Sequence, residues 1–193
     1  MTTAGLPPEI DGPLYVFGYG SLIWRTGFTH EQAHPALLRG FHRRFCLWSR
    51  LYRGTPEAPG LVLGLDRGGA CRGLAFRVAA GQAAEVLAYL DERENPNGEA
   101  VYHRRFLPVR LLDSGRVVQA VTYIANRAHQ AYCRPPAEEA ARAIASGVGT
   151  TGPNRDYLLN TVAHLKALGV TDSGLNRIAA LLPEATASGA GTK

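Results

Sequence analysis

The sequence predicts an α+β fold, in which helices pack against a curved or barrel-like sheet and the last third of the chain is helical. Short apolar runs typical of strands fill most of the first two thirds of the 193 residues. One amphipathic helical pattern interrupts these runs, and three more helical patterns follow them. Because strands and helices do not alternate regularly, a chain of βαβ units is not expected.

The expected strands differ in what ends them. Residues 14–17 form an apolar run stopped by Gly18, which is typical of a buried strand. Residues 52–60 are rich in proline and glycine and are predicted to form a loop. Pro108 cannot donate to a neighbouring strand, so its own strand is expected at a sheet edge or with a bulge. Residues 37–48 are predicted to form one or two strands. Two further strands are predicted at residues 61–65 and 73–78, around a turn at 66–69. A last pair is predicted at residues 102–112 and 117–125, around a hairpin turn at 113–116.

Four stretches carry a helical pattern: residues 82–94, about 136–146, about 154–168 and about 172–182. Asn154 is expected to cap the third helix, and Asp172 or Ser173 the fourth. We therefore expect three parts: a loose arm at residues 1–13, a single domain at residues 14–183, and a disordered tail at residues 184–193.

Composition and charge exclude several classes of protein. Hydrophobic residues make up 46% of the chain, and no apolar run approaches the ~20 residues of a membrane-spanning helix. The net charge of +5 comes almost entirely from arginines, which are dispersed along the chain, so no nucleic-acid partner is expected. Three well-separated cysteines and the lack of a signal-peptide pattern indicate a reducing compartment and a cytoplasmic location.

A glycine-containing loop follows the first predicted strand: Phe17, Gly18, Tyr19, Gly20, Ser21 and Leu22. Glycines let the backbone approach a ligand closely, and successive N–H groups can then bind an anion. No Gly-Lys-Ser/Thr follows, and the dinucleotide-binding glycine pattern is incomplete, so neither type of nucleotide loop is expected. Taken alone, the segment fits either a substrate-holding loop or a tight turn at a strand end.

An acidic residue ends the apolar face of the first predicted helix. At about 100° per residue, Leu87, Leu90 and Glu94 follow one another on one stripe. If Glu94 is half-buried, desolvation raises its pKa toward neutrality, and such a carboxyl suits general acid–base catalysis. The alternative is a solvated acid at the helix end, or one paired with Arg93 or Arg104.

Three further side chains are candidates for contact with a substrate: Arg53, Tyr102 and Tyr157. Each also fits a structural role, as a loop charge or a core aromatic. His30 and His34 are four residues apart, but Pro35 opposes a helix there, so no metal site is expected. Ser21 has no evident base to activate it, so a serine hydrolase is not expected either.

Several segments match, in order, the pattern of one known family. They are residues 16–24 (Val-Phe-Gly-Tyr-Gly-Ser-Leu-Ile-Trp), 43–45 (Arg-Arg-Phe), 53–56 (Arg-Gly-Thr-Pro), 73–77 (Gly-Leu-Ala-Phe-Arg), 89–94 (Tyr-Leu-Asp-Glu-Arg-Glu) and 154–158 (Asn-Arg-Asp-Tyr-Leu). Together they resemble the ChaC family of glutathione-specific γ-glutamylcyclotransferases. The resemblance implies a small mixed barrel with flanking helices, Glu94 as the general acid–base, a substrate-holding loop from Gly18 to Leu22, and neither metal nor cofactor.

The resemblance also implies a reaction, the cleavage of glutathione into 5-oxoproline and Cys-Gly. The α-amine of the γ-glutamyl group attacks its own γ-carbonyl, so the reaction is intramolecular. We expect a small-molecule substrate, a protein that is a monomer or a homodimer, and no membrane or nucleic-acid partner. Two alternatives stay open: a cyclotransferase for other γ-glutamyl amides, and a non-catalytic regulatory module on the same fold.

Overall fold

Five strands form a closed barrel in the computed structural model, which describes residues 12–184. They are β1 (Leu14–Gly18), β2 (Gln32–Ser49), β3 (Gly60–Val78), β4 (Tyr102–Leu111) and β5 (Val117–Ala125), in the order β1-β3-β2-β4-β5. The helices are α1 (Ala83–Glu94), α2 (Ala137–Ser146), α3 (Asn154–Ala167) and α4 (Ser173–Ala180), with short strands β6 (Val148–Gly149) and β7 (Gly152–Pro153) before α3. The predicted α+β class with a barrel-like sheet is confirmed. The arm expected at residues 1–13 and the tail expected at 184–193 lie outside the described residues, except for 12, 13 and 184.

The longest feature is an antiparallel hairpin of β2 and β3, which pair along almost their whole length. Each is one continuous strand, so the predicted turn at residues 66–69 between two shorter strands is wrong. Gly68 and Gly69 have φ angles of +101° and +70°, and the register shifts opposite them between Arg39 and Phe41. Because β2 stays paired alongside, the glycines bend the hairpin at a bulge and do not reverse the chain.

β1 closes the barrel because it pairs with a strand on each side. Val16 lies opposite Phe76 of β3 in an antiparallel ladder and opposite Val121 of β5 in a parallel one. β1 ends at Gly18, and β3 and β5 also pair directly with each other. The chain therefore leaves the barrel wall after Gly18, where the next residues can line a cavity.

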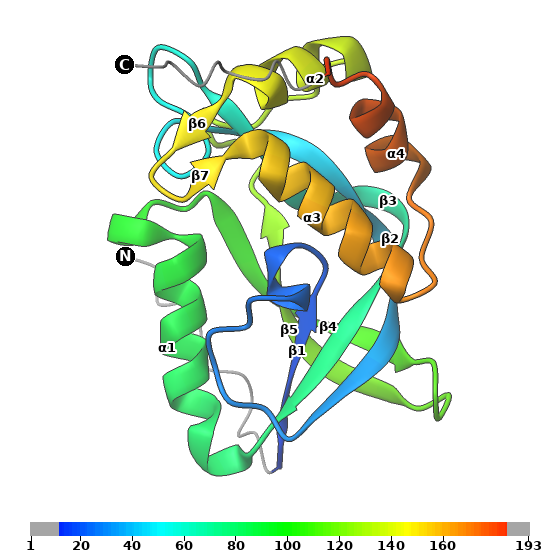
Figure 1. Ribbon diagram of the computed structural model, residues 1–193. Coiled ribbons are helices and arrows are strands. Elements are labelled where there is room, and N and C mark those ends of the chain that lie inside the picture. The colour runs from blue at the N-terminus through cyan, green and yellow to red at the C-terminus, as the bar shows by residue number, and fades with distance from the viewer. Residues whose placement is uncertain (1–11, 185–193) are drawn as a thin grey trace, which may run out of the picture.

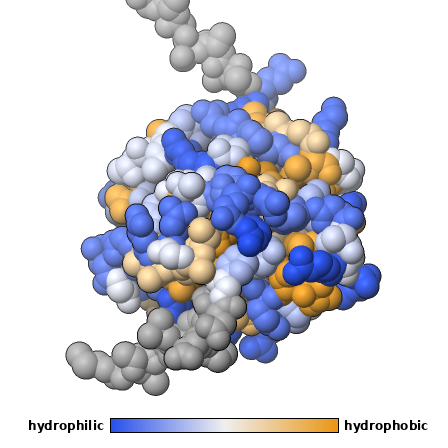
Figure 2. All heavy atoms as spheres, turned by 90° about the horizontal axis from the view of Figure 1, so that it is seen from below, coloured by the Kyte–Doolittle hydropathy of each residue, from blue (hydrophilic) through white to orange (hydrophobic). Residues whose placement is uncertain are grey.

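The apolar side chains of the barrel fall into two clusters. Leu14 and Val16 of β1 pack in the cluster that contains α1, whereas Tyr15 and Phe17 belong to the cluster that contains α2, α3 and α4. Figure 1 shows the placement of the helices that contribute to these clusters, with α1 at the left of the strands and the other helices above and to the right. On the face shown in Figure 2, apolar residues form separate patches among hydrophilic ones. Within residues 12–184, no helix has both the length and the apolar character needed to cross a bilayer.

The helix ends include one confirmed and one wrong capping prediction. Asp172 caps α4, because its Oδ1 accepts a 3.1 Å hydrogen bond from the Leu175 amide. Asn154 is the first residue of α3 and does not cap it, because its buried side chain pairs with both backbone groups of Leu61, at 2.6 and 2.8 Å. A long-range contact thus uses the side chain that the local pattern assigned to a cap. Pro108 lies where β4 pairs with β5 alone, as an edge position requires.

Candidate active site

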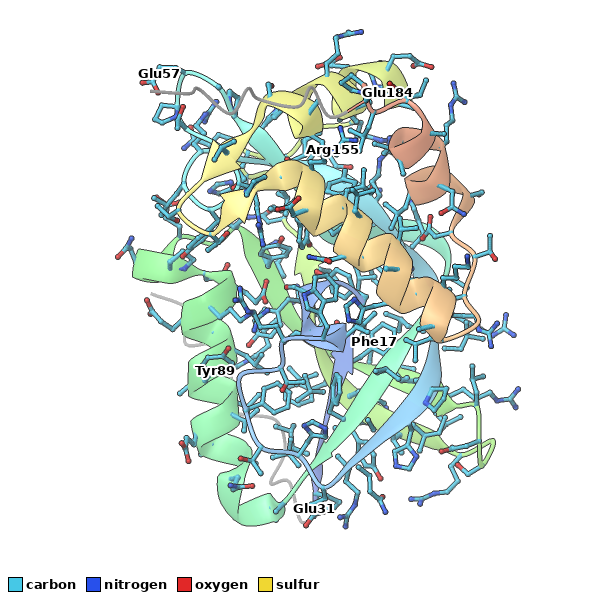
Figure 3. All side chains as sticks on the ribbon, viewed as in Figure 1. Phe17, Glu31, Glu57, Tyr89, Arg155 and Glu184 are labelled. Atoms are coloured by element: carbon cyan, nitrogen blue, oxygen red, sulfur yellow. The ribbon has the colours of Figure 1, made fainter. Side chains whose placement is uncertain are left out.

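A cavity of about 630 Å³ opens at the end of β1. All but one of the residues predicted to act on a substrate line it: Phe17, Tyr19, Gly20, Ser21, Leu22, Arg53, Glu94, Tyr102 and Tyr157. Figure 3 labels Phe17 on β1 and Tyr89 on α1, two of the elements that contribute to its wall. The fold thus gathers side chains from separate strands, helices and loops around one space.

Gly18 is the predicted site residue that does not line the cavity. It lies in β1 opposite Leu74 of β3. A Cβ at this position would stand 3.0 Å from Leu22 Cβ and 3.0 Å from Phe76 Cε2. The missing side chain of Gly18 therefore lets the next turn pack back onto the barrel, which is a structural contribution.

The loop after β1 turns into a short 3-10 helix, Ser21–Ile23, whose first amides are free. The Ile23 amide donates to the Gly20 carbonyl and the Arg25 amide to the Ser21 carbonyl, at 2.9 and 2.8 Å. Among the hydrogen bonds within residues 12–184, the N–H groups of Gly20, Ser21 and Leu22 have no protein acceptor. Three successive unpaired amides beside a cavity are suited to bind an anion.

Arg43 of β2 supports this loop from inside the protein. It is a buried arginine whose Nε donates to the Tyr19 carbonyl and whose second amino group donates to the Arg72 carbonyl. The remaining amino group donates to Asp172 at 3.0 Å. Arg43 thereby fixes the Tyr19 carbonyl, so the following amides face a constant direction.

Glu94 is the last residue of α1, and it continues the buried stripe as predicted. The stripe consists of Ala83, Val86, Leu87 and Leu90. The Glu94 side chain is 18% exposed, and within residues 12–184 no donor makes a hydrogen bond to it. Burial raises the pKa of Glu94 above its usual range, and the positive charge of Arg93, whose Nε lies 3.4 Å from Glu94 Oε1, opposes that rise.

Buried tyrosines surround the carboxylate. Tyr19 Oη donates to the Tyr123 carbonyl at 3.0 Å, and Tyr102 Oη donates to the Leu63 carbonyl at 2.7 Å. Burial raises the pKa of Tyr19, Tyr102 and Tyr157, and the nearby charge of Glu94 raises each further. These phenols therefore stay neutral and supply a weakly polar wall, which strengthens the desolvation of Glu94.

Arg53 lies at the cavity wall, against Tyr157. Its guanidinium carbon stands 5.1 Å from the Tyr157 ring centre, and one amino group donates to the carbonyls of Thr151 and Pro153 at 2.8 and 3.2 Å. Burial lowers the pKa of Arg53, and the positive charge of Arg25 lowers it further. Since arginines stay protonated in proteins, Arg25 and Arg53 together form a positive patch at the cavity.

Two arginines have roles that the sequence alone does not reveal. Arg43 lies in a segment that matches the family pattern, and Arg93 is predicted only as a possible ion-pair partner of Glu94. The structure places Arg93 between α1 and the loop, where it donates to Ser21 Oγ at 2.9 Å. The four-residue spacing of Tyr89 and Arg93 puts both side chains on one face of the predicted helix, and this spacing is the sequence feature that could have indicated their contact. Within residues 12–184 no three His, Cys, Asp or Glu side chains gather as a metal site, so no metal ligands are assigned.

Comparisons with known proteins point to one family. A family profile described as "ChaC-like protein" matches residues 14–185. The chain is 36% identical over 179 residues to "Glutathione-specific gamma-glutamylcyclotransferase" of Escherichia coli (strain K12), covering 91% of this chain and 74% of that protein. It is 32% identical over 173 residues to "Glutathione-specific gamma-glutamylcyclotransferase 1" of Homo sapiens, covering 84% and 75%.

A solved structure has the same fold. It is a γ-glutamyl cyclotransferase specific to glutathione from yeast, with a TM-score of 0.80 and 24% identity to this chain. The superposition covers 89% of this chain and 96% of that one.

Proposed function

The chain belongs to the ChaC-like family, and on this premise we propose that it is a γ-glutamylcyclotransferase that cleaves glutathione into 5-oxoproline and Cys-Gly. One observation carries the proposal: Glu94 lies in a cavity, without a hydrogen-bond donor from residues 12–184, beside a loop with three free amides. A buried acid that serves only stability normally accepts hydrogen bonds, whereas Glu94 has only the Arg93 charge at 3.4 Å among residues 12–184, which favours a catalytic role.

The polar groups of the cavity suit the two ends of glutathione. The γ-glutamyl end carries an ammonium and a carboxylate, and the far end carries a second carboxylate. The free amides of residues 20–22 are suited to the first carboxylate or to the developing oxyanion, and Arg53 to the second. The cavity of about 630 Å³ is within the range of roughly 300–1,000 Å³ that is typical of small-molecule sites.

The proposed reaction begins with Glu94 as a carboxylate. It takes a proton from the α-ammonium of the substrate, and the freed nitrogen attacks the γ-carbonyl carbon of the same residue. A five-membered ring closes with negative charge on the carbonyl oxygen, which the loop amides stabilise. Glu94 gives its proton to the cysteine nitrogen as the bond from that carbon to this nitrogen breaks. The ring nitrogen still carries two protons after the attack; the Glu94 carboxylate takes one of them and passes it to the released amine, which leaves as an ammonium. Two protons thus move from the α-nitrogen to the leaving nitrogen, and no co-reactant is needed.

The raised pKa of Glu94 fits both halves of this sequence. A carboxylate with an ordinary pKa is too weak a base to take a proton from an ammonium at neutral pH. Desolvation increases its basicity, and the same group is then a competent acid toward the leaving amine. Tyr102 and Tyr157 are assigned to the walls that hold the substrate against Glu94, and Phe17 to the floor of the cavity.

The setting of the reaction is part of the same proposal. We place it in the cytoplasm, in a domain formed by residues 14–183 that works as a monomer or homodimer without a cofactor. The partner is a small molecule, with no nucleic acid and no membrane involved.

The test is an incubation of the purified protein with glutathione, γ-Glu-Ala and γ-Glu-ε-Lys, followed by quantification of 5-oxoproline from each. The proposal predicts that glutathione gives the highest rate and that Cys-Gly appears in equal amount. A higher rate with either other compound would replace glutathione by another γ-glutamyl amide. Absence of 5-oxoproline from all three would leave the regulatory module as the function.

A further inference from the structure

The side chain of Arg93 connects the catalytic helix to the substrate loop. One amino group donates to Ser21 Oγ at 2.9 Å. The other donates to the carbonyls of Arg25 and Thr26, at 2.9 and 3.2 Å, and to Tyr89 Oη at 3.0 Å. Since protein acceptors occupy both amino groups, this guanidinium is committed to the loop and is poorly placed to bind substrate itself.

Arg93 also places the nearest positive charge beside Glu94, with Nε 3.4 Å from Glu94 Oε1. Four tyrosines near Glu94 come from different elements: Tyr19 after β1, Tyr102 on β4, Tyr123 on β5 and Tyr157 on α3. Burial raises the pKa of all four, so they remain neutral. Arg25, Arg50, Arg53, Glu99 and His129 also line the cavity. Of the charged residues between 12 and 184, Arg93 is the one whose charge opposes the rise that burial causes in the pKa of Glu94, and it is also 3.4 Å from the carboxylate.

We propose that Arg93 is a positioning residue with two separable roles: its two amino groups hold the loop of residues 21–26 in place for substrate, and its charge keeps Glu94 able to lose its proton. The inference rests on the proposed function, because it assumes that Glu94 acts as the base. The proposed function gives roles to the loop and to Glu94, and this inference adds a role for Arg93, the residue that contacts both.

The two roles predict different kinetic effects. The loop carries the free amides of residues 20–22, so its displacement weakens substrate binding and raises KM. The charge acts on the proton equilibrium of Glu94, which must be ionised in the free enzyme to accept a proton. Loss of the charge raises the pKa of Glu94, so the acidic limb of the kcat/KM profile moves to higher pH.

Three variants separate the roles, with 5-oxoproline formation measured from about pH 5 to pH 9, a window that brackets the neutral range. Arg93→Met loses both, so its acidic limb should move up by roughly one pH unit, since a charge within hydrogen-bonding range shifts a pKa by about that much. Arg93→Lys keeps the charge and loses the planar fork, so its limb should stay while KM rises several-fold. Ser21→Ala removes one acceptor of the fork, so it should also raise KM and leave the limb unchanged. Arg177→Met removes an exposed arginine paired with Glu138, and serves as the matched control with wild-type kinetics.

The outcomes distinguish this inference from the proposed function. Circular dichroism shows whether Arg93→Met is folded. If it is folded and the acidic limb of its kcat/KM profile stays at the wild-type pH, the charge role is wrong. If that variant does not fold, Arg93→Lys decides: a moved limb, or an unchanged KM, contradicts the inference. If Glu94→Gln still forms 5-oxoproline at the wild-type rate, the proposed function fails first. If that variant is inactive and the Arg93 variants behave like wild type, only the inference fails.

Discussion

Two carboxylates with little solvent exposure, Asp66 in β3 and Glu94 at the end of α1, have opposite surroundings. The Asp66 side chain is 1% exposed, and it accepts hydrogen bonds from Arg127 Nε at 2.7 Å, Tyr132 Oη at 2.9 Å and the Arg67 amide at 2.9 Å. Glu94 is 18% exposed, opens to a cavity, and receives no hydrogen bond from residues 12–184.

Their pKa values move in opposite directions as a result. Burial alone would raise the pKa of Asp66, but the hydrogen bonds from Arg127 and Tyr132 hold it below its usual range. Burial raises the pKa of Glu94, and among residues 12–184 only Arg93 opposes that rise. A satisfied carboxylate fastens two segments together, whereas an unsatisfied one is ready to exchange a proton with a ligand.

The largest expected effect is on catalysis. Glu94→Gln keeps the shape of the side chain and removes its ability to take up and return a proton. Turnover should fall by about 10²–10⁴-fold, the usual contribution of general acid–base catalysis, with KM nearly unchanged. The measurement is 5-oxoproline formation from glutathione. If the variant retains more than a small fraction of wild-type kcat, Glu94 is not the general acid–base.

Asp66→Asn should affect stability and spare catalysis. The amide cannot accept from Arg127 and Tyr132 as the carboxylate does, so the free energy of unfolding should fall by roughly 1–3 kcal/mol at pH 7, where the partly exposed Arg127 limits the loss. Because the pKa of Asp66 is lowered by folding, this contribution is present above its unfolded pKa and disappears as pH falls. Urea titrations at pH 7 and at about pH 2.5, below the unfolded pKa of about 3.9, check both the size and the sign. A lower kcat in a folded Asp66→Asn variant would contradict the assignment of Asp66 to stability alone.

The next prediction concerns substrate binding in the cavity beside Glu94. Arg53→Ala should raise KM for glutathione by about tenfold, which corresponds to ~1.4 kcal/mol, while kcat changes little. Arg155→Ala is the matched control, because Arg155 donates to the Pro183 carbonyl and does not line the cavity. An unchanged KM in steady-state assays of Arg53→Ala would remove Arg53 from the site.

The smallest effect is on the stability of the Glu94→Gln variant. The folded pKa of Glu94 is above its unfolded value, so the unfolded state binds fewer protons in the window between them, and wild-type stability falls as pH rises through it. The variant should therefore have a higher Tm than wild type at pH 7, and the difference should shrink toward pH 4. Thermal unfolding at the two pH values tests this, and a variant with a lower Tm at pH 7 would oppose it.

Much of the fold was predictable because local patterns matched their final surroundings. The apolar run of residues 14–17, the loop at residues 52–60 and the hairpin around residues 113–116 all appear where expected. The turn predicted at residues 66–69 failed because a glycine pair with positive φ fits both a turn and a bulge. Only the long pairing of β2 with β3 decides between the two, and the sequence does not contain that register in local form.

Most residues of the candidate site were predictable from the sequence, but the hydrogen bonds that join them were not. Periodicity placed Glu94 on a buried stripe, and glycine composition identified the loop. The fork that joins Arg93 to Ser21, and the support of Tyr19 by Arg43, depend on side chains from distant segments. Gly18 belonged to the same motif as Gly20, yet its position inside β1 gives it a packing role.

Glu94 is a desolvated acid that receives no hydrogen bond from residues 12–184, whereas Asp66 accepts several. A titration of protein labelled with ¹³C at the side-chain carboxyls of Asp and Glu, followed by NMR and assigned with Glu94→Gln and Asp66→Asn, measures this difference. We expect a Glu94 pKa above the ordinary value of about 4.3 and an Asp66 pKa below about 3.9. A Glu94 that titrates at or below about 4.3 would contradict this expectation.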